Sequence, residues 1–340
     1  MARLDDLRLM AKVAHLYYRV GLRQTQITER LGVHQSTVSR LLQRAEKEGI
    51  VRISLSLPSG LHPELEDALQ SSYGLREAIV VDSIDREDQI VRDLGGAAAH
   101  HLETTLGPGD VVGISSWSAA LLATVEAMHP SPRAAGARVV QILGGIGNPD
   151  AEVHATQLTR RLAGMLSGAA TLLPAPGAVG SARAKRVLLE DRYVREAVAL
   201  FDALNVAIVG IGAVAPSKLL AASGNVFSPK ELKSLAARGA VGDICLRFFD
   251  AEGAPVATPL NDRVIAIELE QLRRADRVVG IAGGRRKTAA IRGALRGGWV
   301  NVLITDRGTA ERLLRSGAQS RGSRRSVQRV ARLARGARVP

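Results

Sequence analysis

Short runs rich in valine and isoleucine recur along most of this chain, and stretches with helical spacing lie between them. This alternation constrains the fold more than any other feature of the sequence. The predicted strands cover residues 78–81, 111–114, 139–143, 206–211, 278–282 and 300–304, and the predicted helices cover 89–102, 119–128, 155–166, 287–295 and 309–314. Strands that alternate with helices form a parallel sheet with helices on both faces. The sequence therefore predicts an α/β domain with a Rossmann-like parallel sheet.

Small polar residues follow the second predicted strand. Ligands in doubly wound folds bind beyond the carboxyl ends of the strands, and helix N-termini there attract anions. Ser115, Ser116 and Ser118 lie between the strand 111–114 and the helix 119–128, so their hydroxyl and N–H groups converge on one point. This arrangement favours a phosphate site over a simple helix cap, which needs only one serine.

Two glycine pairs, Gly144-Gly145 and Gly283-Gly284, also follow predicted strands. Glycine either lets the backbone approach a ligand closely or provides a turn conformation, and both interpretations stay open here. Lys287 lies in the first turn of a predicted helix, where the helix dipole favours an acid, so an anionic ligand accounts for it best. Asn261-Asp262 after Pro259 fits an ordinary turn and a ligand contact equally well.

The N-terminal part of the chain has the pattern of a helix-turn-helix. Two helical stretches, 24–31 and 35–48, are separated only by Gly32-Val33-His34. The apolar positions that such a motif buries are filled by Ile27, Leu31, Val33, Val38, Leu41 and Leu42. The second helix presents short polar side chains and arginines, which suit base edges and phosphates in the major groove of double-stranded DNA. We expect DNA contacts from Gln24, Gln26, Gln35, Ser36, Thr37, Ser39, Arg40 and Arg44. The alternative is a helical hairpin that arose by chance.

The positive charge of the chain is concentrated at its two ends. Residues 1–60 hold ten Lys/Arg and five Asp/Glu, residues 321–340 hold seven arginines and no acid, and the remainder holds 29 basic and 28 acidic residues. Basic ends on a nearly neutral body indicate that the ends meet a polyanion, while the body binds something small.

A chain of 340 residues suits two domains. We expect a DNA-binding domain over residues 1–57, with a short strand at 50–57. A Pro/Ser/Gly linker would lead into a ligand-binding and oligomerisation domain over residues 58–316, followed by a basic, mostly disordered tail over 317–340.

The sequence contains no run of 18 or more apolar residues, and acids stand near the N-terminus where a signal peptide would need an apolar stretch. Cys245 is the single cysteine, so the chain cannot form an internal disulfide. We therefore expect a cytoplasmic protein that does not contact membranes. The sequence shows no zinc-ligand set, P-loop or nucleophile elbow, and we expect no cofactor and no metal.

A series of segments, taken together and in order, resembles the SorC family of sugar-binding transcriptional regulators over about residues 5–315. Besides the helix-turn-helix, these segments are DVVGISSWS, VVQILGGIGNPDAEVHA, LLPAPG, VAIVGIGAV, GAVGDICLRFFDAEG, TPLNDRVIAI, VVGIAGGRRKTAAIRGAL and VNVLITD. The effector domain of that family resembles sugar-phosphate isomerases and glucosamine-phosphate deaminases and typically binds phosphorylated sugars. The resemblance implies that Lys287 contacts a sugar phosphate and that Asp243 accepts hydrogen bonds from sugar hydroxyls. It also implies a tetramer, and paired DNA half-sites independently require a homo-oligomer of even number, a dimer or a tetramer.

These observations predict a regulator of carbohydrate-metabolism genes whose operator binding responds to a phosphorylated sugar or polyol. One alternative is a sugar-phosphate isomerase or deaminase on the same scaffold. Its candidate acid/base residues, Asp243, Asp262 and His154, are scattered along the chain, and an enzyme has no use for a DNA-binding domain. The other alternative is a structural DNA-binding protein whose body serves only oligomerisation.

Overall fold

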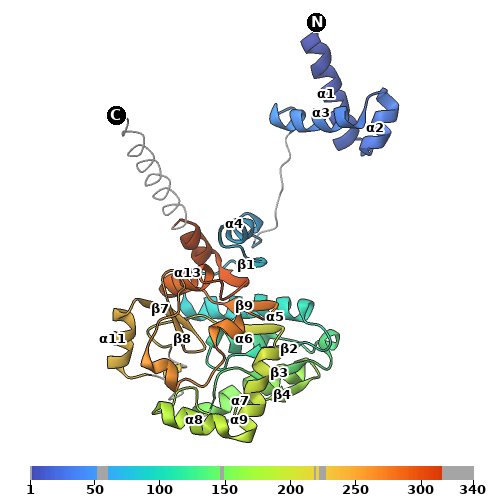
Figure 1. Cartoon of the computed structure of the whole chain (residues 1–340). Helices are drawn as coiled ribbons and strands as arrows, with labels where there is room; N and C mark the ends of the chain where they lie inside the picture. The colour runs from blue at the N-terminus through green and yellow to red at the C-terminus, as the bar shows by residue number, and fades with distance from the viewer. Residues whose placement is uncertain (1, 52–59, 146–148, 218–219, 222–226, 316–340) are drawn as a thin grey trace, which may run out of the picture. The chain divides into compact units, whose positions relative to one another are not determined.

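The computed structural model describes residues 2–51, 60–145, 149–217, 220–221 and 227–315 (Figure 1). The chain divides into two compact units, Met1–Ser59 and Gly60–Pro340. Most of the strand expected at 50–57 and the whole tail over 317–340 lie outside the described residues.

The first unit is built from three helices, α1 (Ala2–Tyr18), α2 (Gln24–Leu31) and α3 (Gln35–Lys47). Gly32 ends α2 with a φ of 63°, a left-handed conformation that glycine adopts without strain, and its N–H donates to the carbonyl of Thr28. A common apolar core joins the three helices through Met10, Val13, Ala14, Leu16, Ile27, Val38, Leu41, Leu42 and Ala45. The predicted helix-turn-helix is therefore confirmed as a fold.

The second unit is organised around a seven-stranded parallel sheet with the order β1-β10-β9-β5-β2-β3-β4. The strands are β1 (Glu77–Val81), β2 (Val111–Ile114), β3 (Arg138–Gln141), β4 (Ala169–Thr171), β5 (Val206–Gly210), β9 (Arg277–Ile281) and β10 (Val302–Asp306). The predicted α/β class and its parallel sheet are confirmed. Strand β4 has the sequence Ala-Ala-Thr and was not predicted, because it lacks the Val/Ile run that marks the other strands.

The strand order reverses once inside this sheet. From β2 the chain adds β3 and then β4 on one side, whereas β5 pairs with the other edge of β2 and is followed outward by β9 and β10. The neighbouring strands β2 and β5 therefore form a topological switch point, where crevices open beyond the carboxyl ends of the strands.

Helices cover both faces of the sheet. Neighbouring residues on a strand point to opposite faces, and accordingly Val139 and Val206 belong to one apolar core while Val140 and Ala207 belong to the other. The helices are α4 (Pro63–Tyr73), α5 (Glu87–Thr105), α6 (Ala119–Ala127), α7 (Pro149–Met165), α8 (Ala182–Glu190), α9 (Arg192–Ala199), α11 (Pro229–Ala237), α12 (Leu269–Leu272) and α13 (Thr288–Arg296). Single turns of 3-10 helix are η1 (Pro132–Ala134), η2 (Leu200–Ala203), η3 (Pro259–Arg263) and η4 (Arg285–Lys287), and residues 307–315 are helical.

A small antiparallel sheet, β6 (Gly212–Ala213), β7 (Ala240–Ile244) and β8 (Arg247–Asp250), stands beside the main sheet, next to α11 in Figure 1. Its β7–β8 hairpin is closed by Cys245 and Leu246, whose φ angles are 53° and 62°. Two left-handed residues define a type I′ turn, which usually contains Asn and Gly. Neither Asn nor Gly stands at positions 245 and 246, so the hairpin was not predicted.

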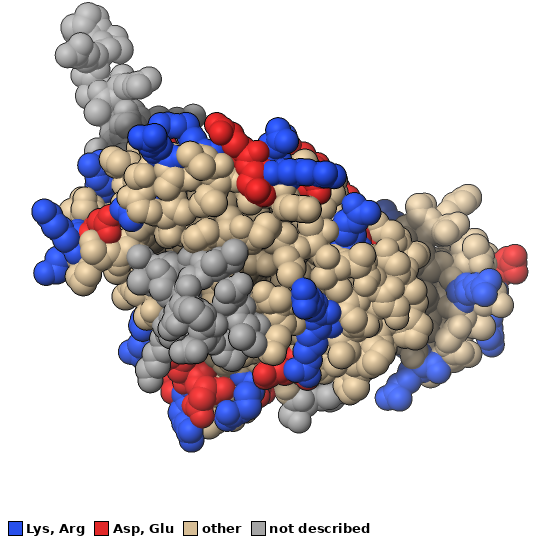
Figure 2. Space-filling model, turned by 90° about the horizontal axis from the view of Figure 1, so that it is seen from below, with Lys and Arg blue, Asp and Glu red and all other residues tan. Residues whose placement is uncertain are grey.

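The surface of the molecule seen in Figure 2 carries basic and acidic side chains interspersed around a broad uncharged area. This face therefore carries no large field of a single sign. The observation agrees with the near balance of charge in the body of the chain.

Candidate functional site

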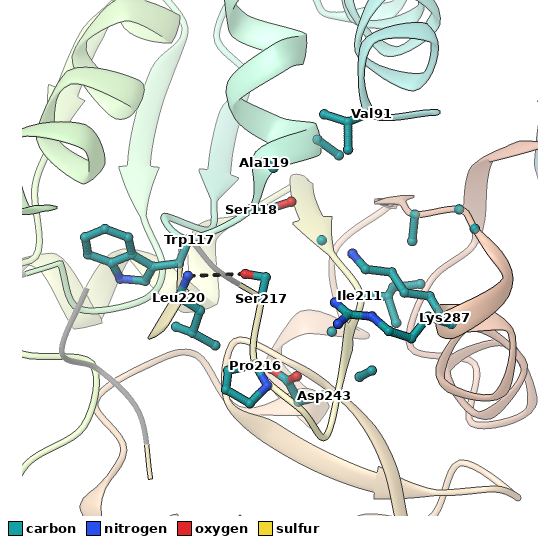
Figure 3. A pocket seen from close by; sticks show the side chains of 18 of the residues that line it. Val91, Trp117, Ser118, Ala119, Ile211, Pro216, Ser217, Leu220, Asp243 and Lys287 are labelled. Carbon is teal, nitrogen blue, oxygen red and sulfur yellow. Dashed lines mark hydrogen bonds between the residues drawn. The ribbon is translucent and has the colours of Figure 1, made fainter. Parts of the chain in front are cut away.

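A pocket of about 250 Å³ opens beyond the carboxyl ends of β2, β5 and β9 (Figure 3). It therefore lies at the switch point of the sheet, where doubly wound folds bind their ligands. Ligand pockets for drug-sized molecules usually enclose roughly 300–1,000 Å³, so a cavity of this size suits a small ligand. Its lining comes from the loop after β1 and the start of α5, the loops after β2, β5 and β9, and the β7–β8 hairpin.

The three serines after β2 do not act alike. Ser115 and Ser118 line the pocket, whereas the hydroxyl of buried Ser116 donates to the carbonyl of Leu143 at 3.1 Å. The Ser118 hydroxyl accepts from the N–H of Leu121 at 3.4 Å and so caps α6 while still facing the cavity. The helix-cap interpretation thus holds for Ser118, and the pocket receives two of the three predicted hydroxyls.

The two glycine pairs have different roles. Gly283 and Gly284 line the pocket, whereas Gly144 and Gly145 are not among its lining residues. A Cβ on Gly144 would meet the backbone of Ala175 and Pro176 at 2.5 Å, so this glycine permits close packing of two chain segments.

Gly283 and Gly284 make room for Asp306, a buried residue at the end of β10. The Gly284 N–H donates to Asp306 Oδ2 at 2.7 Å and to Thr309 Oγ1 at 2.9 Å, and a Cβ on Gly283 would collide with the same carboxylate. Asp306 also accepts from the N–H and the hydroxyl of Thr309. Sequence reasoning missed Asp306, although an acid directly after a Val/Ile run was a signal that could have found it.

Asp243 and Lys287 face the same cavity from β7 and η4 (Figure 3). Asp243 is buried, and its Oδ2 accepts from the N–H of Leu246 at 3.0 Å. Burial raises the pKa of Asp243 to about 6, against the opposing effects of the Leu246 N–H and of Lys287. Burial also lowers the pKa of Lys287, while Asp243 acts in the opposite direction. Lys287 is the last residue of η4 and immediately precedes α13, which begins at Thr288, one residue later than predicted.

Charged residues of both signs surround the pocket next to Lys287. Arg285 and Arg286 are exposed, and Arg286 lies 3.7 Å from Glu87 at the start of α5. Asp85 and Glu87 belong to the lining as well. The pocket lining therefore combines the cationic turn η4 with two carboxylates, one of them paired with Arg286, and sequence reasoning did not anticipate those acids.

Asn261 and Asp262 are not among the lining residues and belong to η3. The carbonyl of Asn261 accepts from Arg247 Nη1 at 3.1 Å and from Lys185 Nζ at 3.2 Å. Arg247 is buried, and it donates to three further carbonyls of residues 264–267. These contacts favour the turn interpretation of Asn261-Asp262.

The residues considered for acid/base chemistry are not gathered at one point. Asp243 lines the pocket, Asp262 does not, and the side chain of His154 lies outside the described part of the structure. Within the described residues, no group of three His, Cys, Asp or Glu side chains could hold a metal ion.

The predicted DNA contacts on α3 fall into two groups. Gln35, Ser36 and Arg40 are exposed, and Thr37 and Ser39 are half-buried. Arg44 instead pairs with Asp6 of α1 at 2.8 Å and with Glu48 at 3.0 Å, which favours a role in holding α3 against α1.

On α2, the predicted residues also contribute to local structure. The side-chain oxygen of exposed Gln26 accepts from the N–H of Arg23 at 2.9 Å and closes a capping box at the start of the helix. Gln24 is half-buried, and its carbonyl accepts from the hydroxyl of Thr28 at 2.9 Å.

Comparison with known proteins identifies both units. The family described as "Putative sugar-binding domain" matches residues 60–315, and a homeodomain-like helix-turn-helix family matches residues 6–53. The sorbitol operon regulator of Klebsiella pneumoniae is 34% identical over 93% of this chain and 100% of its own length. The chain belongs to the SorC family.

Other relatives of similar identity are also named as regulators. The deoxyribonucleoside regulator of Bacillus subtilis is 36% identical over 90% of this chain and 97% of its own length, and the transcriptional regulator LsrR of Escherichia coli K12 is 33% identical over 90% and 94%. The crystal structure of the full-length sorbitol operon regulator covers 91% of this chain and 99% of its own, with 34% identity and a TM-score of 0.69.

This SorC-family chain is accordingly a DNA-binding transcriptional regulator with a sugar-binding domain, and the enzyme alternative is set aside because its relatives are regulators. Within the described residues, no helix combines the length and the apolar character needed to span a membrane.

Proposed function

We propose that this protein regulates carbohydrate-metabolism genes by binding operator DNA through α3, and that a small phosphorylated sugar or polyol in the switch-point pocket modulates that binding. The arrangement of Asp243 and Lys287 around one cavity carries the proposal. A sugar phosphate joins an anion to a set of hydroxyl groups, and the pocket offers a cation for the first and a carboxylate acceptor for the second.

The phosphate would bind at the side of the pocket formed by η4. Lys287 extends into the cavity there, and Arg285 and Arg286 add positive charge beside it. The N-terminus of α6 also faces the cavity through Ala119 and Ala120, and a helix N-terminus favours an anion. Ser115 and Ser118, at the same helix N-terminus, would donate to the phosphate, and the sugar hydroxyls would meet Asp243.

The DNA would be read by the exposed residues of α3, with Gln35, Ser36 and Arg40 at base edges and phosphates. Gln24 and Gln26 would contact the backbone. The internal ion pairs of Arg44 make it the weakest member of the predicted set.

Two further properties belong to the proposal. The chain would act as a homo-oligomer of even number, a dimer or a tetramer, because paired half-sites require two-fold symmetry. Sedimentation that shows a monomer at micromolar concentration, with and without DNA, would contradict this. A regulator of operator DNA would work in the compartment that holds the chromosome, the cytoplasm.

A thermal-shift screen tests the effector class. The probes are sorbitol 6-phosphate, 2-deoxyribose 5-phosphate and glucose 6-phosphate, each beside its unphosphorylated counterpart. At least one phosphorylated probe should stabilise the protein more than its counterpart, because binding to the folded state alone raises the melting temperature. Lys287→Ala should lose this preference and Lys230→Ala, an exposed lysine on α11, should keep it. Equal stabilisation by both forms of every sugar would refute the phosphate site.

A further inference from the structure

The start of α5 forms one side of the pocket, and the loop before it contacts the residue that precedes α4. Asp85, Glu87 and Ile90 line the cavity at the start of α5. A Cβ on Gly283 would lie 3.1 Å from Ile90 and from Leu94, so α5 packs directly against the glycine loop. An anion held at η4 would add a negative charge near the exposed carboxylates of Asp85 and Glu87, and it would repel them across a medium that water partly screens.

The loop between β1 and α5 consists only of residues 82–86, and its first residue is paired. Asp82 Oδ1 lies 2.8 Å from Nε2 of His62, whose side chain is 15% exposed. His62 immediately precedes α4 and lies two residues after Gly60, where the described part of the second unit begins. The Asp82–His62 pair therefore ties the start of α4, at the N-terminal end of the second unit, to the loop that follows β1.

A second connection reaches Asp82 from the glycine loop. The Gly284 N–H donates to Asp306, and the next residue, Arg307, has its Nη1 4.0 Å from Asp82 Oδ1. The helix after His62 is also fastened to β1, because Glu66 Oε1 accepts from the N–H of Val80 at 2.9 Å. The start of α5 and the glycine loop at residues 283–284 are thus both connected to the carboxylate of Asp82.

We propose that the Asp82–His62 pair couples occupancy of the pocket to the linker, and through it to operator binding. The inference rests on the proposed function, since it needs an anionic effector in the pocket. The bound anion repels Asp85 and Glu87 and attracts Arg286 away from Glu87, so the short loop shifts and carries Asp82 with it. Asp82 and His62 do not line the pocket and are positioning residues. Coupling of this kind requires that the effector prefer one of two arrangements of the unit.

The test separates effector binding from its consequence. Affinity for sorbitol 6-phosphate, 2-deoxyribose 5-phosphate or glucose 6-phosphate is measured by calorimetry on the full-length protein. Affinity for a DNA duplex that the protein selects from a random library is measured with and without the probe that binds. The variants are Asp82→Asn, His62→Ala and the double variant, and the matched control is Asp202→Asn, which removes the exposed ion pair of Asp202 with Arg274.

Both single variants should bind the probe like the wild type, while the ratio of operator affinities with and without probe shrinks by roughly 2- to 30-fold. The double variant should match the single ones, because the two residues act as one pair. The control should keep the wild-type ratio.

Three results would overturn the inference. A wild-type ratio in Asp82→Asn and His62→Ala would leave the proposed function intact and remove the coupling role. Loss of probe binding in both variants would place the pair in the binding site instead. Absence of probe binding or of any operator response in the wild type would refute the proposed function first, and the inference with it.

Discussion

The surface proposed to read DNA lies on a single helix of 13 residues, whereas the pocket is assembled from loops that follow β1, β2, β5 and β9 and from the β7–β8 hairpin. On α3, Gln35 and Arg40 are exposed, and a change there leaves the core of the first unit intact. In the pocket, Asp243, Gly284 and Ser118 each take part in hydrogen bonds that also hold the second unit together. Substitutions in the pocket should therefore alter stability and binding together, while substitutions on α3 should alter binding alone.

The largest expected effect is a dependence of the free energy of unfolding on pH, which Asp243 in the pocket causes. The pKa of Asp243 is raised to about 6 in the folded chain from an ordinary value of 3.8, so the folded state holds its proton more tightly than the unfolded state. Stability should fall as pH rises from about 4 to 6, and the loss of ~3 kcal/mol should persist above that range. Asp243→Asn should remove this loss, which urea unfolding at pH 4 and pH 7 would measure.

The control for this experiment is Asp202→Asn, which changes an exposed carboxyl in the same unit. Its unfolding free energy should follow the wild-type dependence on pH. A dependence in Asp243→Asn that equals the wild-type one would show that the buried carboxyl is not coupled to folding.

The next effect concerns Lys287. Lys287→Ala should weaken binding of a sugar phosphate by about 10- to 100-fold, because a charge-assisted hydrogen bond is lost. It should leave operator affinity without effector unchanged. Asp243→Ala should reduce the response less, since it removes only contacts to hydroxyls. The response is measured by titrating operator DNA into the wild type and the two variants, with and without the bound probe. A Lys287→Ala variant that responds at the same probe concentration as the wild type would mean that the phosphate binds elsewhere.

A smaller effect tests the independence of α3. Arg40→Ala and Gln35→Ala should each weaken operator binding by roughly 1–3 kcal/mol through the loss of a base contact. Thermal unfolding and effector binding should stay at wild-type values. Arg44→Ala should instead lower the melting temperature of the first unit, because it frees Asp6 and Glu48. Unchanged operator affinity in Arg40→Ala and Gln35→Ala together would show that α3 is not the reading helix.

The smallest effect concerns the arginine-rich tail over residues 317–340. Its seven arginines and lack of acids can neutralise DNA phosphates without reading sequence. Removal of the tail should flatten the dependence of DNA affinity on salt and leave the preference for the operator unchanged. An identical salt slope for the truncated protein would assign the tail no part in DNA binding.

The sequence predicted local features well and relations between distant segments poorly. The helix-turn-helix follows from apolar residues at helical spacing and six of the sheet strands follow from Val/Ile runs, because both patterns indicate burial. Ser115, Ser118, Lys287 and the pair Gly283-Gly284 meet in one pocket because each follows or faces a strand end at the switch point.

The predicted site residues that do not line the pocket contact residues far from them in the sequence. Ser116 bonds to Leu143, Gly144 packs against the backbone at 175–176, and Asn261 is held by Arg247 and Lys185. A glycine needed for a ligand and a glycine needed for packing have the same sequence signal. Which of the two applies depends on the tertiary structure.

The β7–β8 hairpin has a consequence for engineering. Left-handed conformations cost a residue with a side chain roughly 1–2 kcal/mol each, and Cys245 and Leu246 both adopt one. Asn-Gly would close the same turn with less strain, and it would also replace the Cys245 side chain in the wall of the cavity by an amide and remove that of Leu246. The hairpin is thus a position where thermostability and ligand selectivity trade against each other, and a stabilised version of this regulator made there would be expected to respond to a different range of compounds.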